Sequence, residues 1–189
     1  MLIYYTATTL DGFLADPDDS LEWLLRQPEG DEGFGGGPFG MDTLMARTGA
    51  MVMGSTTYEW ILRHEVAAGQ PWPYTMPTWV MTGRDLAPVE GADIRFASGD
   101  VRKVWDEVTA SAGDKDVWVV GGGDLAGQFA DAGLLDEVVV SIAPVTLGAG
   151  RPLLPRRLEL ELVESATMGP AMLCARYRVT GPLLEDRRP

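Results

Sequence analysis

The chain has 189 residues, of which 46% are hydrophobic and 23% are charged, so it has the composition of a globular protein that can bury a core. Fifteen basic and 28 acidic side chains give a formal net charge of −13, which opposes binding to nucleic acid or to an anionic membrane surface. A single histidine and a single cysteine, Cys174, exclude an internal disulfide and a zinc centre built from those residue types, and we expect no bound metal.

The N-terminus shows no secretion signal, and no apolar run reaches the ~18 residues that a membrane span requires. The cytoplasm is therefore the expected compartment. The length favours one domain over residues 1–189.

The first elements in chain order are a strand over 2–7, a turn over 10–13 and a short helix over 21–27. The spacing Asp19-x-x-Glu22 fits a capping box, so Asp19 is predicted to cap this helix. The segment from Pro28 to Gly40 holds six glycines and two prolines, which is typical of a loop and is compatible with a mobile lid.

A helix over 41–47 leads into a second strand over 49–53, and the turn after this strand holds Gly54 and Ser55 before another helix begins. Further strands are expected over 78–82 and 92–97. The next helix is marked by an apolar spacing of i, i+3, i+4 and i+7 at Val101, Val104, Trp105 and Val108.

The clearest motif is the apolar run 117–120, which stops at three consecutive glycines, Gly121 to Gly123, and resumes as an amphipathic helix. The free N–H groups at such a helix start form a site for phosphate. The motif also fits the dinucleotide fingerprint G-x-G-x-x-A, but the expected acid about 20 residues on is missing from 138–142, so a standard Rossmann domain is disfavoured. The alternative is a turn whose glycines serve only tight packing.

Strands and helices alternate up to the C-terminal region, where 158–167 and 172–179 read as an antiparallel hairpin. The pattern predicts a three-layer α/β/α fold with a mostly parallel central sheet and an antiparallel C-terminal hairpin.

Four motifs in this order resemble the dihydrofolate reductase-like superfamily, and the likeness covers nearly the whole chain. They are Thr9-Leu10-Asp11-Gly12-Phe13-Leu14-Ala15, Met53-Gly54-Ser55-Thr56-Thr57-Tyr58-Glu59, Val119-Val120-Gly121-Gly122-Gly123 and the segment from Ala143 to Leu154. The first and last are most similar to the reductase domain of riboflavin biosynthesis, the RibD C-terminal family.

The resemblance implies an NADPH-dependent reductase whose cofactor lies across the carboxyl ends of the strands. Ala7 and Thr8 would line the nicotinamide, and the adenosine end would rest near Thr82, Gly83 and Arg84. The pyrophosphate would meet two turns, formed by Gly54, Ser55, Thr56 and Thr57 and by Gly121, Gly122, Gly123, Asp124 and Leu125.

Arg84 is a fixed positive charge that suits the 2′-phosphate of NADPH, and its alternative is a surface pair with Asp85. Ser55 departs from the many family members that carry a basic residue there. The preference between NADPH and NADH is therefore open.

Two acids are candidates for proton delivery, Asp11 and Asp19, although the acid position of folate reductases falls on Ser20 in this chain. The structural alternatives are a turn-forming Asp-Gly pair for Asp11 and the helix cap for Asp19. A substrate that takes its proton from water would need neither acid.

Trp23 and Phe34 are candidates to wall a flat heterocycle, and Arg151 is a candidate to attract an anionic substrate. Three functions remain: a reductase of a small heterocycle such as a riboflavin-precursor pyrimidine, a true dihydrofolate or pterin reductase, and a non-catalytic nucleotide-binding module. The resemblance also implies a homodimer through the C-terminal strands.

Overall fold

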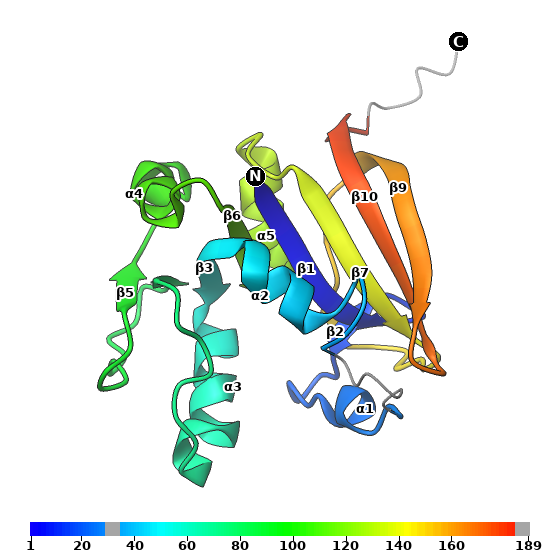
Figure 1. Ribbon diagram of the computed structural model, residues 1–189, viewed down its shortest axis with the longest axis horizontal. Coiled ribbons are helices and arrows are strands. Elements are labelled where there is room, and N and C mark those ends of the chain that lie inside the picture. Colours follow the sequence, from blue (N-terminus) through cyan, green and yellow to red (C-terminus); the bar gives the residue numbers. More distant parts are fainter. Residues whose placement is uncertain (29–34, 184–189) are drawn as a thin grey trace.

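A computed structural model describes residues 1–28 and 35–183. Its centre is an eight-stranded sheet with the order β5-β4-β3-β6-β1-β7-β10-β9 (Figure 1). The six strands from β5 to β7 run parallel, and β10 and β9 continue the sheet antiparallel. The predicted α/β fold with a mostly parallel sheet and a C-terminal hairpin is therefore confirmed.

The strands of this sheet are β1 (Leu2–Thr9), β3 (Thr48–Gly54), β4 (Thr78–Met81), β5 (Ile94–Ala97), β6 (Asp116–Gly121), β7 (Glu137–Ala143), β9 (Leu158–Met168) and β10 (Met172–Pro182). Two short strands, β2 (Phe13–Ala15) and β8 (Arg151–Pro152), pair separately. The helices are α1 (Glu22–Leu25), α2 (Met41–Arg47), α3 (Ser55–His64), α4 (Arg102–Ala112) and α5 (Gly123–Asp131), and η1 (Val66–Ala68) is a 3-10 turn.

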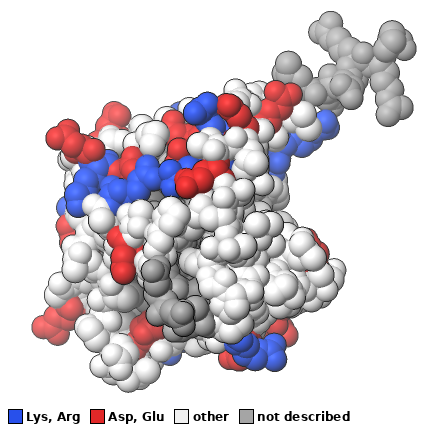
Figure 2. Space-filling model, turned by 45° about the vertical axis from the view of Figure 1, so that its right-hand side comes forward, with Lys and Arg blue, Asp and Glu red and all other residues white. Residues whose placement is uncertain are grey.

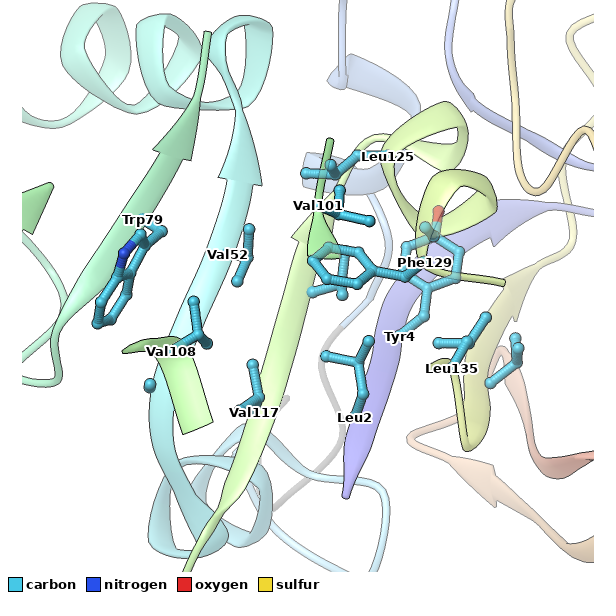
Figure 3. Close-up of a cluster of buried hydrophobic side chains, with 14 of the residues drawn as sticks. Leu2, Tyr4, Val52, Trp79, Val101, Val108, Val117, Leu125, Phe129 and Leu135 are labelled. Carbon is cyan, nitrogen blue, oxygen red and sulfur yellow. The ribbon is translucent and has the colours of Figure 1, made fainter. Parts of the chain in front are cut away.

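Helices cover both faces of the sheet, because the buried parallel strands present apolar side chains on each side. On one face α4 and α5 contribute Val108 and Phe129 to a core with the strand residues Leu2, Val52 and Val117, which line up across neighbouring strands (Figure 3). On the other face α1, α2 and α3 contribute side chains to a second core, including Trp23, Leu44 and Tyr58. These two cores define the three layers.

The predicted cap of the first helix is wrong. Asp19 adopts a left-handed backbone conformation with φ of 62°, and α1 begins after Leu21 with no side chain capping it within the described ranges. The Ser20 hydroxyl instead accepts a hydrogen bond from the Glu22 N–H at 3.2 Å. The carboxylate of Asp19 binds Arg151, 132 residues away in the sequence.

The two glycine turns proposed for phosphate lie at one edge of the sheet, where the parallel strands end. In Figure 1 this is the lower edge, from which α3 leaves β3 and where α1 and β2 lie below β1. None of the described helices is long and apolar enough to cross a membrane.

Candidate active site at the carboxyl ends of the strands

Two helix starts lie side by side at this edge. The register of β3 and β6 pairs Met53 with Gly121, so the turns that follow, at Gly54 and Gly122, are neighbours. Each turn residue is the N-cap of its helix in extended conformation, and no side chain of the described residues caps either helix. The first N–H groups of α3 and α5 are therefore available to an anion, which the two helix dipoles also favour.

The second turn requires glycine at position 123 and is tightly packed at position 121. A Cβ on Gly123 would lie 2.3 Å from the carbonyl oxygens of Pro152 and Leu153, and one on Gly121 would lie 3.0 Å from Thr57 Oγ1. A Cβ on Gly122, by contrast, would have no atom within 4 Å. The turn thus packs against its neighbours on two sides and is open on a third, which leaves room for the group that the helix starts attract.

The strands β1 and β6 separate toward the same edge. Their pairing ends at Tyr4 with Val119, although β1 continues to Thr9. The Tyr5 carbonyl still accepts a hydrogen bond from the Trp118 indole of β6 at 3.0 Å. Backbone groups alternate in direction along a strand, so the peptide groups of Ala7 face the same side as those of Tyr5, beyond the last paired residue.

Thr8 presents little to a ligand in this arrangement. Its residue is 2% exposed, and its hydroxyl donates to the Phe13 carbonyl at 3.1 Å. Of the two residues predicted to line the nicotinamide, Ala7 is half-buried and is the one placed at the opening between β1 and β6.

Arg84 lies just beyond β4, on the opposite side of β3 from the glycine turn. Its guanidinium forms a bidentate pair with Glu59 of α3, with N–O distances of 3.0 and 2.8 Å. The alternative pairing with Asp85 is therefore not the one observed. Thr82 Oγ1 accepts a hydrogen bond from the Arg84 N–H, which fixes the turn between them.

Asp11 ties the turn after β1 to the loop after β7. Its carboxylate accepts hydrogen bonds from Thr9 Oγ1 at 2.6 Å, from the Leu147 N–H at 3.0 Å and from the Gly148 N–H at 2.7 Å. These bonds, with that from Thr9 the strongest, hold the pKa of Asp11 below its usual value. The arrangement stabilises an ionised carboxylate, which disfavours the proton-donating role predicted for it.

Asp19 is held in a similar way by Arg151, through N–O distances of 2.6 and 3.1 Å. The hydrogen bonds and charge of Arg151 lower the pKa of Asp19. The same pair engages the guanidinium that was predicted to attract an anionic substrate. Proton donation by Asp19 and anion capture by Arg151 stay predictions that this contact disfavours.

Trp23 has the one buried indole N–H of the described residues without a hydrogen-bond partner. Its residue is only 4% exposed and belongs to the core between the sheet and α1 to α3. An unpaired buried donor costs ~1–3 kcal/mol. Its burial places Trp23 in the core and not in the wall of an open site. Phe34, the other predicted wall residue, lies outside the described residues.

Several of these contacts have no signal in the sequence. The bidentate partner of Arg84 is not predictable because Glu59 belongs to a different element. The backbone donors to Asp11 at 147 and 148 and the partner of Asp19 lie more than 130 residues away. The described residues contain no group of three or more His, Cys, Asp or Glu placed to hold a metal ion.

The fold is of the dihydrofolate reductase-like class. A family model, that of the RibD C-terminal domain, matches residues 72–174, more than half of the chain. The chain therefore belongs to the RibD C-terminal domain family.

Relatives and solved structures agree with this assignment. The Bacillus subtilis protein YwjB is 29% identical over 153 residues, which cover 80% of each chain. The crystal structure of a putative riboflavin biosynthesis protein from Shewanella sp. PV-4 has a TM-score of 0.78 and 25% identity, covering 95% of this chain and 98% of that one. Dihydrofolate reductase from Enterococcus faecalis, complexed with NADP(H), has a TM-score of 0.56 and 13% identity over 95% and 96% of the two chains, which shows the common fold.

Proposed function

We propose that this protein is an NADPH-dependent reductase that transfers a hydride to a small heterocyclic substrate. The observation that carries the proposal is the pair of uncapped helix starts at Gly54 and Gly122, side by side at the carboxyl edge of the sheet in a chain of a reductase family. The residues fit a dinucleotide: two helix dipoles face one anion, and Gly122 leaves open space beside them.

The order of the strands gives the cofactor its direction along the edge. With the pyrophosphate at the turns of β3 and β6, one end of the molecule meets β4 and Arg84, and the other meets the opening between β6 and β1 at Ala7. The peptide groups of Ala7 offer a donor and an acceptor that match a carboxamide. We assign the adenosine end to the first side and the nicotinamide to the second.

When bound, the nicotinamide supplies the hydride; the protein supplies alignment. The substrate must also gain a proton. Because Asp11 and Asp19 are both held ionised, we propose that this proton comes from water, which favours a riboflavin-precursor pyrimidine or related heterocycle over a pterin that needs an acid beside it.

The first test is a titration of the purified protein with NADPH, followed by quenching of tryptophan fluorescence. We expect saturable binding with energy transfer from tryptophan to the nicotinamide, and slow oxidation of NADPH with pyrimidine substrates but not with dihydrofolate. Turnover of dihydrofolate would favour the pterin reductase instead. Binding without turnover of any heterocycle would favour the non-catalytic nucleotide-binding module, and no binding of NADPH or NADH would overturn the proposal.

A further inference from the structure

The charge around Arg84 is unusual for a site that would receive a phosphate. Both terminal nitrogens of the Arg84 guanidinium donate hydrogen bonds to the Glu59 carboxylate, at 3.0 and 2.8 Å. Asp85 follows Arg84 directly in the sequence. The turn at 54–57 contains no basic residue, and the position where a positive charge would attract a phosphate holds Ser55. The guanidinium of Arg84 is therefore paired with one carboxylate, and the pair carries no net formal charge.

This arrangement acts differently on the two nicotinamide cofactors. A 2′-phosphate that binds the two terminal nitrogens of the guanidinium must compete with Glu59 and also approaches its negative charge, so part of its attraction to Arg84 is lost. A ribose with a free 2′-hydroxyl meets no such penalty and can donate a hydrogen bond to the Glu59 carboxylate, the role an acid plays toward NADH in other folds.

We propose that Glu59 is a specificity-determining residue that withholds Arg84 from the 2′-phosphate, so that the protein binds NADPH and NADH with similar affinity. The inference rests on the proposed function, since it concerns the adenosine end of the same cofactor. The inference goes beyond the proposed function because it assigns the weak discrimination between NADPH and NADH to the carboxylate of Glu59. Because the pair is exposed, with Arg84 side-chain exposure of 52% and that of Glu59 30%, it contributes little to folding and can be altered without loss of structure.

The test is the ratio of the dissociation constants for NADH and NADPH, measured by tryptophan quenching in the wild type and in Glu59→Gln. We expect a wild-type ratio within about tenfold of one and an increase of roughly tenfold in NADPH affinity in Glu59→Gln, with little gain for NADH. The gain should shrink as salt is raised, because the released contact is electrostatic. Thermal unfolding of both proteins checks that the fold is unchanged.

A matched control is Asp85→Asn, which removes the same charge one residue from Arg84 without breaking the bidentate pair. We expect it to change the ratio much less than Glu59→Gln. Adding Arg84→Gln to Glu59→Gln should abolish the gain, which would assign it to the freed guanidinium.

The outcomes separate the two proposals. A wild type that binds NADPH more than 100-fold more tightly than NADH, or a ratio that Glu59→Gln leaves unchanged, would overturn the role of Glu59 and leave the reductase standing. Equal gains in Glu59→Gln and Asp85→Asn would also overturn it, in favour of a general charge effect. Binding of neither cofactor to any variant would overturn both proposals.

Discussion

Asp11 accepts the most hydrogen bonds of the described residues at the site, and these bonds make the stability of the protein depend on pH. Because the folded state lowers its pKa, the stability that Asp11 contributes is fully present above the unfolded-state pKa of about 3.9 and is lost as the pH falls through the lower folded-state value. Asp19, whose pKa is lowered by Arg151, acts in the same direction.

We therefore expect Asp11→Asn to lose stability at pH 7 and to show a shallower decline than the wild type when the pH is reduced from 5 to 3. The asparagine cannot accept all three hydrogen bonds as strongly as a carboxylate does. Urea unfolding at several pH values measures this. Asp18→Asn, in which the altered side chain has no such network, is the control; a parallel decline in the wild type and Asp11→Asn would contradict the assignment.

Single residues also show which contacts cannot be predicted from the sequence. The charge of Arg84 and the acids Asp11 and Asp19 were recognised as candidates, since their residue types and flanking motifs are local signals. Their partners were not, because a guanidinium or carboxylate on one element carries no information about which distant element folds against it. The spacing of Asp19 and Glu22 predicts a helix cap, but the Asp19 carboxylate instead pairs with Arg151, 132 residues away.

At the scale of elements, the sequence predicted the secondary structure well where the signal was periodic. The helix over 41–47 coincides with α2, and both strands of the hairpin appear as β9 and β10. The pairing of β2 with β8 was missed, because strands of three and two residues are too short to show alternation and join segments far apart in the chain.

The contact of α5 with the strand segment at 152–153 leads to a prediction for the glycine turn. Gly123→Ala places a methyl group 2.3 Å from two carbonyl oxygens, so the helix start must shift, which we expect to cost ~1–3 kcal/mol in the free energy of unfolding and to weaken cofactor binding. Chemical denaturation and the NADPH titration measure the two effects.

The control is Gly54→Ala at the start of α3, where the nearest atoms to the new Cβ lie 3.9 Å away. Both variants add one methyl group at a helix start, but only the first meets backbone atoms. A similar loss of stability in the two proteins would show that the close approach at Gly123 does not matter.

At the scale of the whole molecule, the sheet edge formed by β9 and β10 carries several exposed apolar side chains. Leu162 and Leu160 of β9 stand opposite Tyr177 and Val179 of β10, so they share one sheet face, and both are exposed. Leu173 of β10 is exposed as well. Figure 2, with the side of β9 and β10 turned forward, shows a band of basic and acidic side chains across its upper part and a largely uncharged area below it.

We propose that this face forms the homodimer contact implied by the family resemblance. Burying exposed leucines of a second copy gains ~25 cal/mol per Å² of apolar surface removed from water. Leu162→Lys should therefore shift the protein toward the monomer in multi-angle light scattering, while Leu25→Lys, an equally exposed leucine on α1, should not. A wild type that is monomeric at high micromolar concentration would contradict the proposal.

The segment from 144 to 153 contacts both the turn after β1 and the glycine turn after β6. Its backbone donates to Asp11 at 147 and 148 and pairs with β2 at 151 and 152, while the carbonyls at 152 and 153 set the position of Gly123 in the glycine turn. An exchange of this loop between relatives would thus alter the cofactor turn along with the substrate side. We therefore expect β2, this segment and the start of α5 to change together when the substrate range changes, whether in evolution or in engineering.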